Sequence, residues 1–298
     1  MAFSIEDFRD LYDFSSHYLD RGELRYHYLD EGKGAPIVML HGNPTWSFLF
    51  RDLVRALRQS YRVVVPDHMG CGLSDKPSPD QYGYRLRDRI ADLEALLEAL
   101  KLQRDLTLVV HDWGGVIGMS YAVRHPDSLA RLVVLNTAAF HLPAGKRLPW
   151  ALRFCRKSRI AAYLILRFNA FALAASFAGT ARGLSQKVRK GLIGPYDSRQ
   201  HRIATLRFVQ DIPIEPNDVS YSILSEVEQN LRRLREIPML IAWGEKDPVF
   251  DLDFLAEWVR RFPDAEVHRF PEAGHYVVED SSSRLVPLLK GFLDRHPV

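Results

Sequence analysis

Residues 108–115 read Leu-Val-Val-His-Asp-Trp-Gly-Gly, and this stretch decides the fold of the chain. The apolar, largely β-branched run at 106–110 is typical of a parallel strand that is buried on both faces. Gly114 and Gly118 allow the helix that follows to pack closely against that strand. The pattern therefore predicts a buried strand, a sharp turn and a helix, with the side chain of Asp112 at the tip of the turn.

A strand, turn and helix of this kind can present a nucleophile at the carboxyl end of a sheet. Val110 occupies the position where a glycine usually precedes the nucleophile by two residues, so the local pattern is a weak match by itself. Asp112 is ionised at neutral pH and can attack carbon to give a covalent ester. A lone Asp after a strand is more often a helix cap, so its interpretation as a nucleophile depends on partners elsewhere in the chain.

Two further polar residues follow predicted strands in the order of a catalytic triad. Asp247 comes after the strand at 238–243, and His275 comes after the strand at 265–270. Parallel strands place their carboxyl ends at one edge of a sheet, so we expect both side chains to meet Asp112 there. An acid that holds one nitrogen of His275 lets the other nitrogen accept a proton from water, and this water opens the ester.

Two hydrogen-bond donors are predicted beside the nucleophile. Trp113 offers an indole N–H, and Asn43, in the turn after the strand at 36–40, offers an amide NH₂. The turn that holds Asn43 is also where an α/β-hydrolase supplies the second backbone N–H of its oxyanion hole. Donors that converge on one point suit an anion that departs without needing a proton.

The glycine-rich loop at 66–77 resembles a phosphate cradle at first sight, but its glycines lack the spacing of such a motif. Asp67 and His68 in this loop are interpreted as residues that lock the loop rather than as metal ligands. We therefore expect an enzyme that uses neither a metal nor a cofactor.

Strands alternate with helices along most of the chain, which predicts a mostly parallel sheet with helices on both faces. The alternation fails at about 141–216, where helical segments, aromatic residues and basic residues predominate. We predict an α/β-hydrolase fold with an eight-stranded sheet. Its core comprises residues 1–140 and 217–298, and residues 141–216 form an inserted helical cap.

The stretch 161–178 in the cap is nearly all apolar. It is marginal in length for a membrane span and has Arg167 and Asn169 near its middle, so we interpret it as a cap helix that lines a deep apolar pocket. Large apolar side chains are expected to form the wall of the pocket: Phe140, Phe168, Phe171, Leu173 and Phe177.

The net charge of +3 conceals a strong asymmetry. Residues 146–207 contain fourteen Lys or Arg and one acid, Asp197, so the rest of the chain has 26 basic and 36 acidic residues. This basic cap either balances the acidic core or binds an acidic protein partner, an anionic carrier or an anionic membrane surface. A nucleic-acid partner is not expected, because no recognition module is visible.

The two cysteines, Cys71 and Cys155, are too few for a disulfide framework, which favours a reducing compartment. The first sixteen residues carry four acidic side chains and lack the basic-then-apolar pattern of a signal peptide. We therefore expect a cytoplasmic location.

The sequence resembles the haloalkane dehalogenase family at four motifs spread over nearly the whole chain: 41–46, 67–77, 111–115 and 274–275. The resemblance implies that Asn43 and Trp113 hold a halide. It also implies that Asp112 displaces the halide to form an alkyl ester, and that water activated by His275 opens that ester. Some branches of the family place the acid after the sixth strand. That position holds no carboxylate here, so Asp247 takes the role.

A narrower resemblance extends through the cap to the β-lactone decarboxylases of bacterial long-chain olefin biosynthesis. It is carried by four motifs: 136–140, 168–171, 195–197 and 207–213. It implies that Asp112 opens a strained lactone and that the liberated carboxylate occupies the anion site before it leaves as CO₂. We predict an Asp-nucleophile enzyme that displaces a halide or carboxylate from a hydrophobic alkyl substrate, with β-lactone decarboxylation as the alternative.

Two other functions are weighed against these. Epoxide hydrolases also use an Asp at this turn, but they need cap tyrosines to protonate an alkoxide, and Tyr163, Tyr196 and Tyr221 are available. A hydrolase-fold scaffold recruited through the basic cap is the alternative without catalysis. The complete set of nucleophile, acid and histidine argues against a scaffold.

Overall fold

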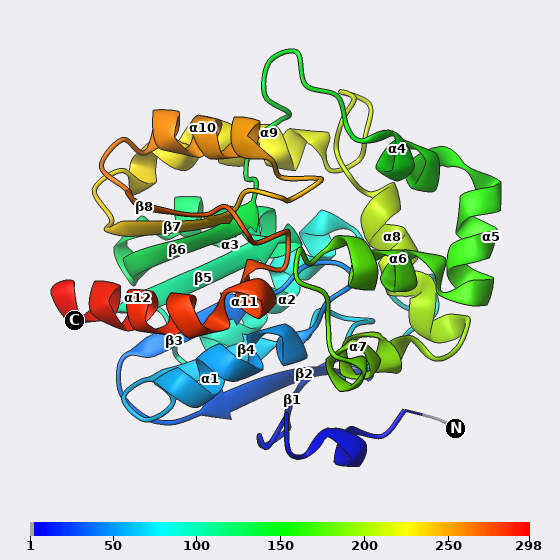
Figure 1. The fold of residues 1–298 in the computed structure, drawn as a ribbon, viewed down its shortest axis with the longest axis horizontal. Coiled ribbons are helices and arrows are strands. Elements are labelled where there is room, and N and C mark those ends of the chain that lie inside the picture. The colour runs from blue at the N-terminus through cyan, green and yellow to red at the C-terminus, as the bar shows by residue number, and fades with distance from the viewer. Residues whose placement is uncertain (1–2) are drawn as a thin grey trace.

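The structure is a computed structural model that describes residues 3–298. A single eight-stranded sheet lies at its centre, in the order β1-β2-β4-β3-β5-β6-β7-β8 (Figure 1). The strands are β1 (His17–Arg21), β2 (Leu24–Glu31), β3 (Pro36–Leu40), β4 (Arg62–Pro66), β5 (Leu106–Asp112), β6 (Leu129–Thr137), β7 (Met239–Gly244) and β8 (Glu266–Phe270). The β1–β2 hairpin is antiparallel and joins β4 antiparallel, whereas β3 to β8 run parallel. The predicted α/β-hydrolase architecture is confirmed.

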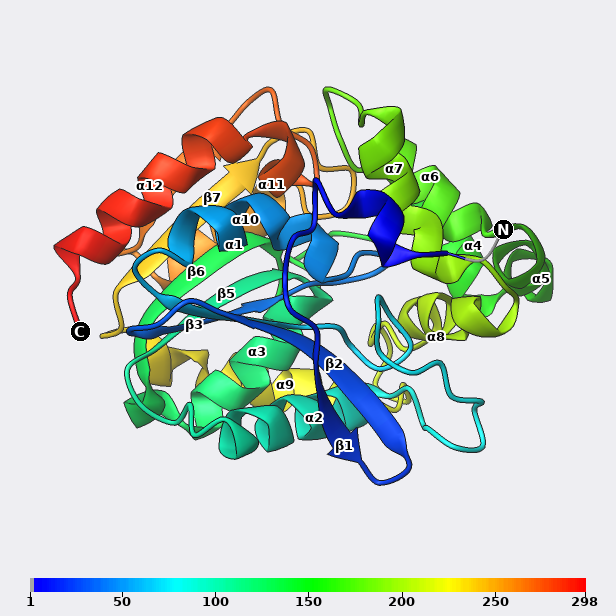
Figure 2. The same cartoon turned by 90° about the horizontal axis from the view of Figure 1, so that it is seen from below.

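Helices cover both faces of the sheet because alternate residues of each central strand face opposite cores. On β5, Leu108 and Val110 face one core and Val109 faces the other. The first core is closed by α2 (Leu86–Ala99), α3 (Trp113–Arg124), α9 (Tyr221–Asn230) and α10 (Leu252–Arg261). The second is closed by α1 (Arg51–Leu57) and α12 (Ser282–Arg295), with α11 (Val277–Asp280) beside them. Figure 2 shows α1 and α12 on one side of the sheet and α2 and α3 on the other.

Short 3₁₀ turns complete the connections of the described chain. They are η1 (Ile5–Phe8), η2 (Ser47–Phe50), η3 (Pro126–Ser128), η4 (Gly194–Tyr196), η5 (Gln200–Arg202) and η6 (Leu231–Leu234).

Five helices lie between β6 and α9 and gather at one end of the sheet (Figure 1). They are α4 (Trp150–Lys157), α5 (Arg159–Phe168), α6 (Ala170–Ala178), α7 (Gln186–Ile193) and α8 (Ile203–Gln210). We refer to them as the cap.

The prediction of a single cap helix at 161–178 is wrong, because two helices, α5 and α6, occupy this stretch. Asn169 adopts a left-handed conformation, with φ of 55° and ψ of 31°, and separates α5 from α6. Asn tolerates this region of backbone space better than most residues, so it ends one helix and redirects the chain by 83°. Within residues 3–298 no single helix is both long and apolar enough to cross a membrane, and α5 and α6 meet that criterion only when taken together.

Candidate active site

The turn between β5 and α3 is as sharp as the sequence predicts. Asp112 has a positive φ of 51°, a strained value that the surrounding packing must enforce. A Cβ atom at Gly114 would lie 2.1 Å from the carbonyl oxygen of Leu40, so a larger residue would push α3 away from β3. The glycine therefore allows α3 to begin directly behind the Asp112 side chain.

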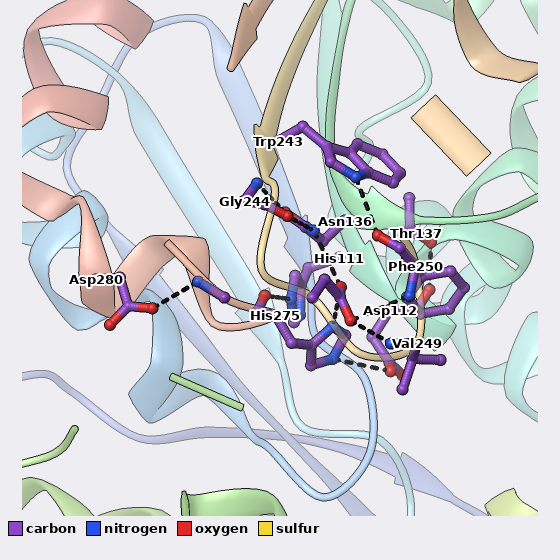
Figure 3. A network of polar contacts seen from close by, with 12 residues as sticks. His111, Asp112, Asn136, Thr137, Trp243, Gly244, Val249, Phe250, His275 and Asp280 are labelled. Carbon is purple, nitrogen blue, oxygen red and sulfur yellow. Dashed lines mark hydrogen bonds and ion pairs between the residues drawn. The ribbon is translucent and has the colours of Figure 1, made fainter. Parts of the chain in front are cut away.

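The two carboxylate oxygens of Asp112 have different surroundings. The Oδ1 atom accepts hydrogen bonds from the backbone N–H groups of Asn43, at 3.1 Å, and Trp113, at 2.5 Å. The Oδ2 atom lies 3.2 Å from Nε2 of His275 (Figure 3). One oxygen is thus held in an oxyanion hole, and the other remains available to attack a carbon atom in the cavity that Asp112 lines.

His275 lies between two carboxylates. Its Nδ1 is 2.7 Å from Oδ2 of Asp247, and its Nε2 faces Asp112. Burial lowers the pKa of His275, but Asp247 and then Asp112 outweigh burial and raise that pKa to about 10. Burial also tends to raise the pKa of Asp112, yet the hydrogen bond to His275 holds it below the ordinary value. At neutral pH the free site therefore contains an imidazolium between two carboxylates.

A second histidine supports the loop that carries His275. Nε2 of His111 donates to the backbone carbonyl of His275 at 2.9 Å (Figure 3). Burial, followed by the positive charge of His275, lowers the pKa of His111 to about 4. His111 is consequently neutral at physiological pH, and its N–H positions the catalytic loop without competing for protons.

Besides His275, three donors hold Asp247, and one of them is a residue to which the sequence pattern assigns no role. Val249 and Phe250 donate their backbone N–H groups to Oδ1 at 2.7 and 3.0 Å, and Nδ2 of Asn136 donates to Oδ2 at 3.0 Å. Asn136 also bonds both polar backbone groups of Gly244, so it joins the end of β6 to the end of β7. An Asn at a strand end where relatives place an acid is the signal that identifies this positioning residue.

Replacing Asn136 with Asp tests this arrangement. The change removes a donor and places a second carboxylate beside Asp247, and like charges raise the pKa of such a pair. We expect the acidic limb of the pH–rate profile to move upward by about one unit or more. The measurement is product formation as a function of pH. Asn217→Asp, at an exposed site, is the matched control. An unchanged acidic limb in Asn136→Asp would show that Asn136 does not tune the acid.

The predicted anion site lies beside the nucleophile. Asn43 and Trp113 line the same cavity as Asp112 and His275. Nδ2 of Asn43 donates one hydrogen to the backbone carbonyl of Thr205 in the cap at 3.1 Å, which leaves its other hydrogen for a ligand. A backbone carbonyl of the cap therefore orients the side-chain amide of Asn43, which belongs to the core.

A buried cation lies behind this anion site. The Arg89 guanidinium carbon is 3.6 Å from the centre of the Phe208 ring and 6.0 Å from the Trp113 ring. Arg89 is fully buried and donates to the carbonyl of Tyr84, and among residues 3–298 no carboxylate forms an ion pair with it. A buried charge without a counterion favours an anion nearby. The sequence signal is an Arg on the inward face of α2, four residues before Leu93.

A cavity of about 460 Å³ lies between the core and the cap, and its wall is predominantly apolar. Phe140 and Phe171 line it. The placement of Phe168 and Phe177 in the wall is wrong, since these side chains are 53% and 62% exposed, and Leu173 is also exposed. The break at Asn169 determines which sides of α5 and α6 face the cavity. Phe168 on α5 and Phe177 on α6 both lie on the sides that face solvent.

The three tyrosines that an epoxide hydrolase would require lie elsewhere. Tyr163 is exposed on α5, Tyr196 donates its hydroxyl to the carbonyl of Thr45, and Tyr221 stacks on His141. None of the three is among the described residues that line the cavity. These three tyrosines therefore do not supply the acidic hydroxyls that an epoxide hydrolase needs in the cavity.

Asp67 forms buried contacts that lock its loop, as the sequence predicts. It pairs with Nδ1 of His27 at 2.9 Å and accepts the backbone N–H groups of Ser47 and Leu73. Asp67 thereby ties the loop to β2 and to the turn after β3.

Comparisons with known proteins agree with this geometry. The family model described as alpha/beta hydrolase fold matches residues 35–282. The chain is 48% identical to the cis-3-alkyl-4-alkyloxetan-2-one decarboxylase of Shewanella oneidensis, over 95% of this chain and 89% of that protein. It is 45% identical to the protein of the same name from Xanthomonas campestris pv. campestris, over 96% and 98% of the two chains.

Haloalkane dehalogenases are also similar, at lower identity. Haloalkane dehalogenase 2 of Mycobacterium tuberculosis is 35% identical over 92% of this chain and 93% of its own length. The crystal structure of haloalkane dehalogenase DbeA from Bradyrhizobium elkani superposes with a TM-score of 0.84 at 26% identity, covering 95% of this chain and 98% of that one.

Proposed function

Because this chain belongs to the α/β-hydrolase family, we propose its function from the chemistry of an aspartate nucleophile at the turn after β5. The haloalkane dehalogenases and the oxetanone decarboxylases are the relatives that guide this proposal. It is an enzyme, and the proposed reaction is the decarboxylation of cis-3,4-dialkyl β-lactones to cis-olefins. The observation that carries the proposal is a carboxylate nucleophile facing a largely apolar cavity of about 460 Å³ beside the anion site, in a chain nearly half identical to decarboxylases. This favours the alternative from the sequence over halide displacement.

In the first step Oδ2 of Asp112 attacks ring carbon C4 from the side opposite the ring oxygen. The C4–O bond breaks, its electrons remain on oxygen, and a free carboxylate appears on C3 while C4 becomes esterified to Asp112. The amide of Asn43 and the indole N–H of Trp113, two residues that line the cavity, bind that carboxylate, with the charge of Arg89 behind them. Relief of ring strain drives the opening.

In the second step the bond between C3 and the carboxylate carbon breaks, and its electrons form the C3=C4 double bond. CO₂ leaves, the C4–O bond to Asp112 breaks, and the carboxylate of Asp112 is regenerated. The carboxylate on C3 keeps a negative charge in the site, so His275 remains an imidazolium. This cation, 3.2 Å from Oδ2 in the free site, stabilises the negative charge that returns to that oxygen. Inversion at C4 followed by anti elimination converts a cis lactone into a cis olefin, and no water is consumed.

Halide displacement is the second candidate, because the donors Asn43 and Trp113 suit a halide as well as a carboxylate. A halide provides no electrons for elimination, so the ester must be hydrolysed. Esterification removes the charge of Asp112, which is one of the groups that raise the pKa of His275. That pKa then falls, and a neutral His275 held by Asp247 can accept a proton from water.

Turnover in ¹⁸O-labelled water distinguishes the two chemistries. With a long-chain cis β-lactone we expect equal amounts of CO₂ and cis-olefin by gas chromatography, and an unlabelled Asp112 by peptide mass spectrometry. With a bromoalkane, water attacks the ester carbonyl, so Asp112 should gain ¹⁸O. Formation of a β-hydroxy acid from the lactone, or incorporation of ¹⁸O from water into Asp112 during lactone turnover, would refute decarboxylation. Bromide release without any olefin would leave dehalogenation as the activity.

A further inference from the structure

The α5 helix presents an apolar stripe to solvent. Ile160, Tyr163, Leu164 and Phe168 are 67%, 60%, 38% and 53% exposed. Their spacing of three, four and eight residues from Ile160 places them on one face of the helix. Figures 1 and 2 both show α5 at the outer end of the cap, away from the sheet.

The neighbouring cap helices continue this pattern. Trp150 and Phe154 are exposed on α4, and Leu173 and Phe177 are exposed on α6. Eight of the thirteen large apolar side chains exposed in the described structure therefore belong to three consecutive helices. The three helices pack against one another in succession, and a monomer rarely leaves so many apolar side chains exposed on adjoining helices unless they bind something. We call these eight side chains the cap face.

Positive charge accompanies the cap face. Arg153, Arg159 and Arg167 are exposed on α4 and α5, and across residues 3–298 none of them pairs with a carboxylate. The segment from 146 to 196 contains no acidic residue. Exposed Trp, Tyr and Phe side chains beside unpaired arginines are typical of helices that lie in the interface of an anionic membrane.

The cavity is continuous with the same helices. Phe154 and Leu164 are exposed on the cap face and also line the cavity, as do the exposed Ala174 and Ala178 on α6. An apolar molecule could therefore pass between lipid and the site of Asp112 along an apolar path.

We propose that the cap face docks on an anionic lipid bilayer, with α5 lying in the interface and the cavity opening toward the acyl chains. For the passage of reactants the proposal rests on the proposed function, because a dialkyl lactone and an olefin both partition into lipid. An acidic protein would pair with the arginines, but it would leave the exposed Ile160, Phe168 and Phe177 without an equally apolar surface. The lipid bilayer complements both features.

Vesicle flotation of the full chain tests the docking. We expect at least about tenfold more protein on vesicles with about 30% phosphatidylglycerol than on pure phosphatidylcholine, since basic residues near an anionic surface strengthen binding. The triple variant Ile160→Ser, Phe168→Ser, Phe177→Ser should lose at least about tenfold of this binding. Its matched control carries the same change at three exposed apolar sites outside the cap: Tyr18, Val219 and Leu252.

A charge variant provides an independent arm. The triple variant Arg153→Glu, Arg159→Glu, Arg167→Glu should abolish the preference for phosphatidylglycerol. The matched control Lys33→Glu, Arg104→Glu, Lys290→Glu changes three exposed basic sites of the core and should keep that preference. Equal binding of cap and control variants, or no flotation of the wild-type chain, would overturn the proposal. Retention on immobilised polyglutamate without flotation would overturn it in favour of an acidic protein partner.

Two further variants distinguish a failure of the docking proposal from a failure of the proposed reaction. The Asp112→Ala variant should float with vesicles like the wild-type chain, so membrane docking is tested independently of catalytic activity. The serine triple variant should keep its kcat/KM on a short-chain, water-soluble lactone and lose activity on a long-chain lactone dissolved in vesicles. An equal loss on both substrates would show that the cap face serves folding or the site itself and not docking.

Discussion

Asp112→Ala is expected to lower olefin formation by about 10⁴-fold or more, which is typical when a covalent nucleophile is removed. Among residues 3–298, Asp112 alone places a carboxylate at the tip of the β5–α3 turn, where both backbone donors of the oxyanion hole converge. Alanine leaves those N–H groups without an acceptor and the cavity without a nucleophile. The measurement is gas chromatography of olefin formed from a long-chain cis β-lactone.

Asp112→Asn sharpens this test because it preserves shape. An amide oxygen can still accept the hydrogen bonds from Asn43 and Trp113, but the amide is neutral and a poor nucleophile. We expect the Asp112→Asn variant to be as inactive as the alanine variant, with an unchanged melting temperature as the control for folding. Activity above about one per cent of wild type in freshly purified alanine variant would exclude covalent catalysis by Asp112.

His275→Gln is expected to separate the two chemistries of the site. With a bromoalkane, water can no longer be activated, so bromide release should stop after one equivalent and an alkyl ester should accumulate on Asp112. With a β-lactone the ester collapses without water. We expect turnover to fall by about 10² to 10³-fold, because the cation beside Oδ2 is lost when the ester collapses, and any ester that forms should decay to olefin rather than persist.

Intact-mass spectrometry of the His275→Gln chain measures the ester, with wild-type bromide release as the reference. His268→Gln is the matched control, since His268 lies on β8, away from the cavity. A wild-type enzyme that releases bromide while its His275→Gln variant carries no adduct would contradict displacement by Asp112. A stable adduct from the lactone would contradict direct elimination and assign a hydrolytic role to His275 in both reactions.

The sequence by itself determined the architecture and the order of the predicted catalytic residues. A β-branched run followed by an Asp and close-packed glycines has few conformations open to it, so the β5–α3 turn was predictable from residues 106–118. Parallel strands share one carboxyl edge, which is why Asp247 and His275 could be expected beside Asp112 although 135 and 163 residues separate them from it.

Tertiary structure alone decided which cap residues face inward and which polar groups assist the site. One left-handed residue, Asn169, redirects α6 by 83°, and Phe168 and Phe177 lie on outward faces instead of in the cavity wall. The bond from Asn136 to Asp247 and the place of Arg89 behind Trp113 join segments far apart in the sequence. Periodicity reports that a helix has an apolar face, but the surface against which that face packs is set by long-range contacts.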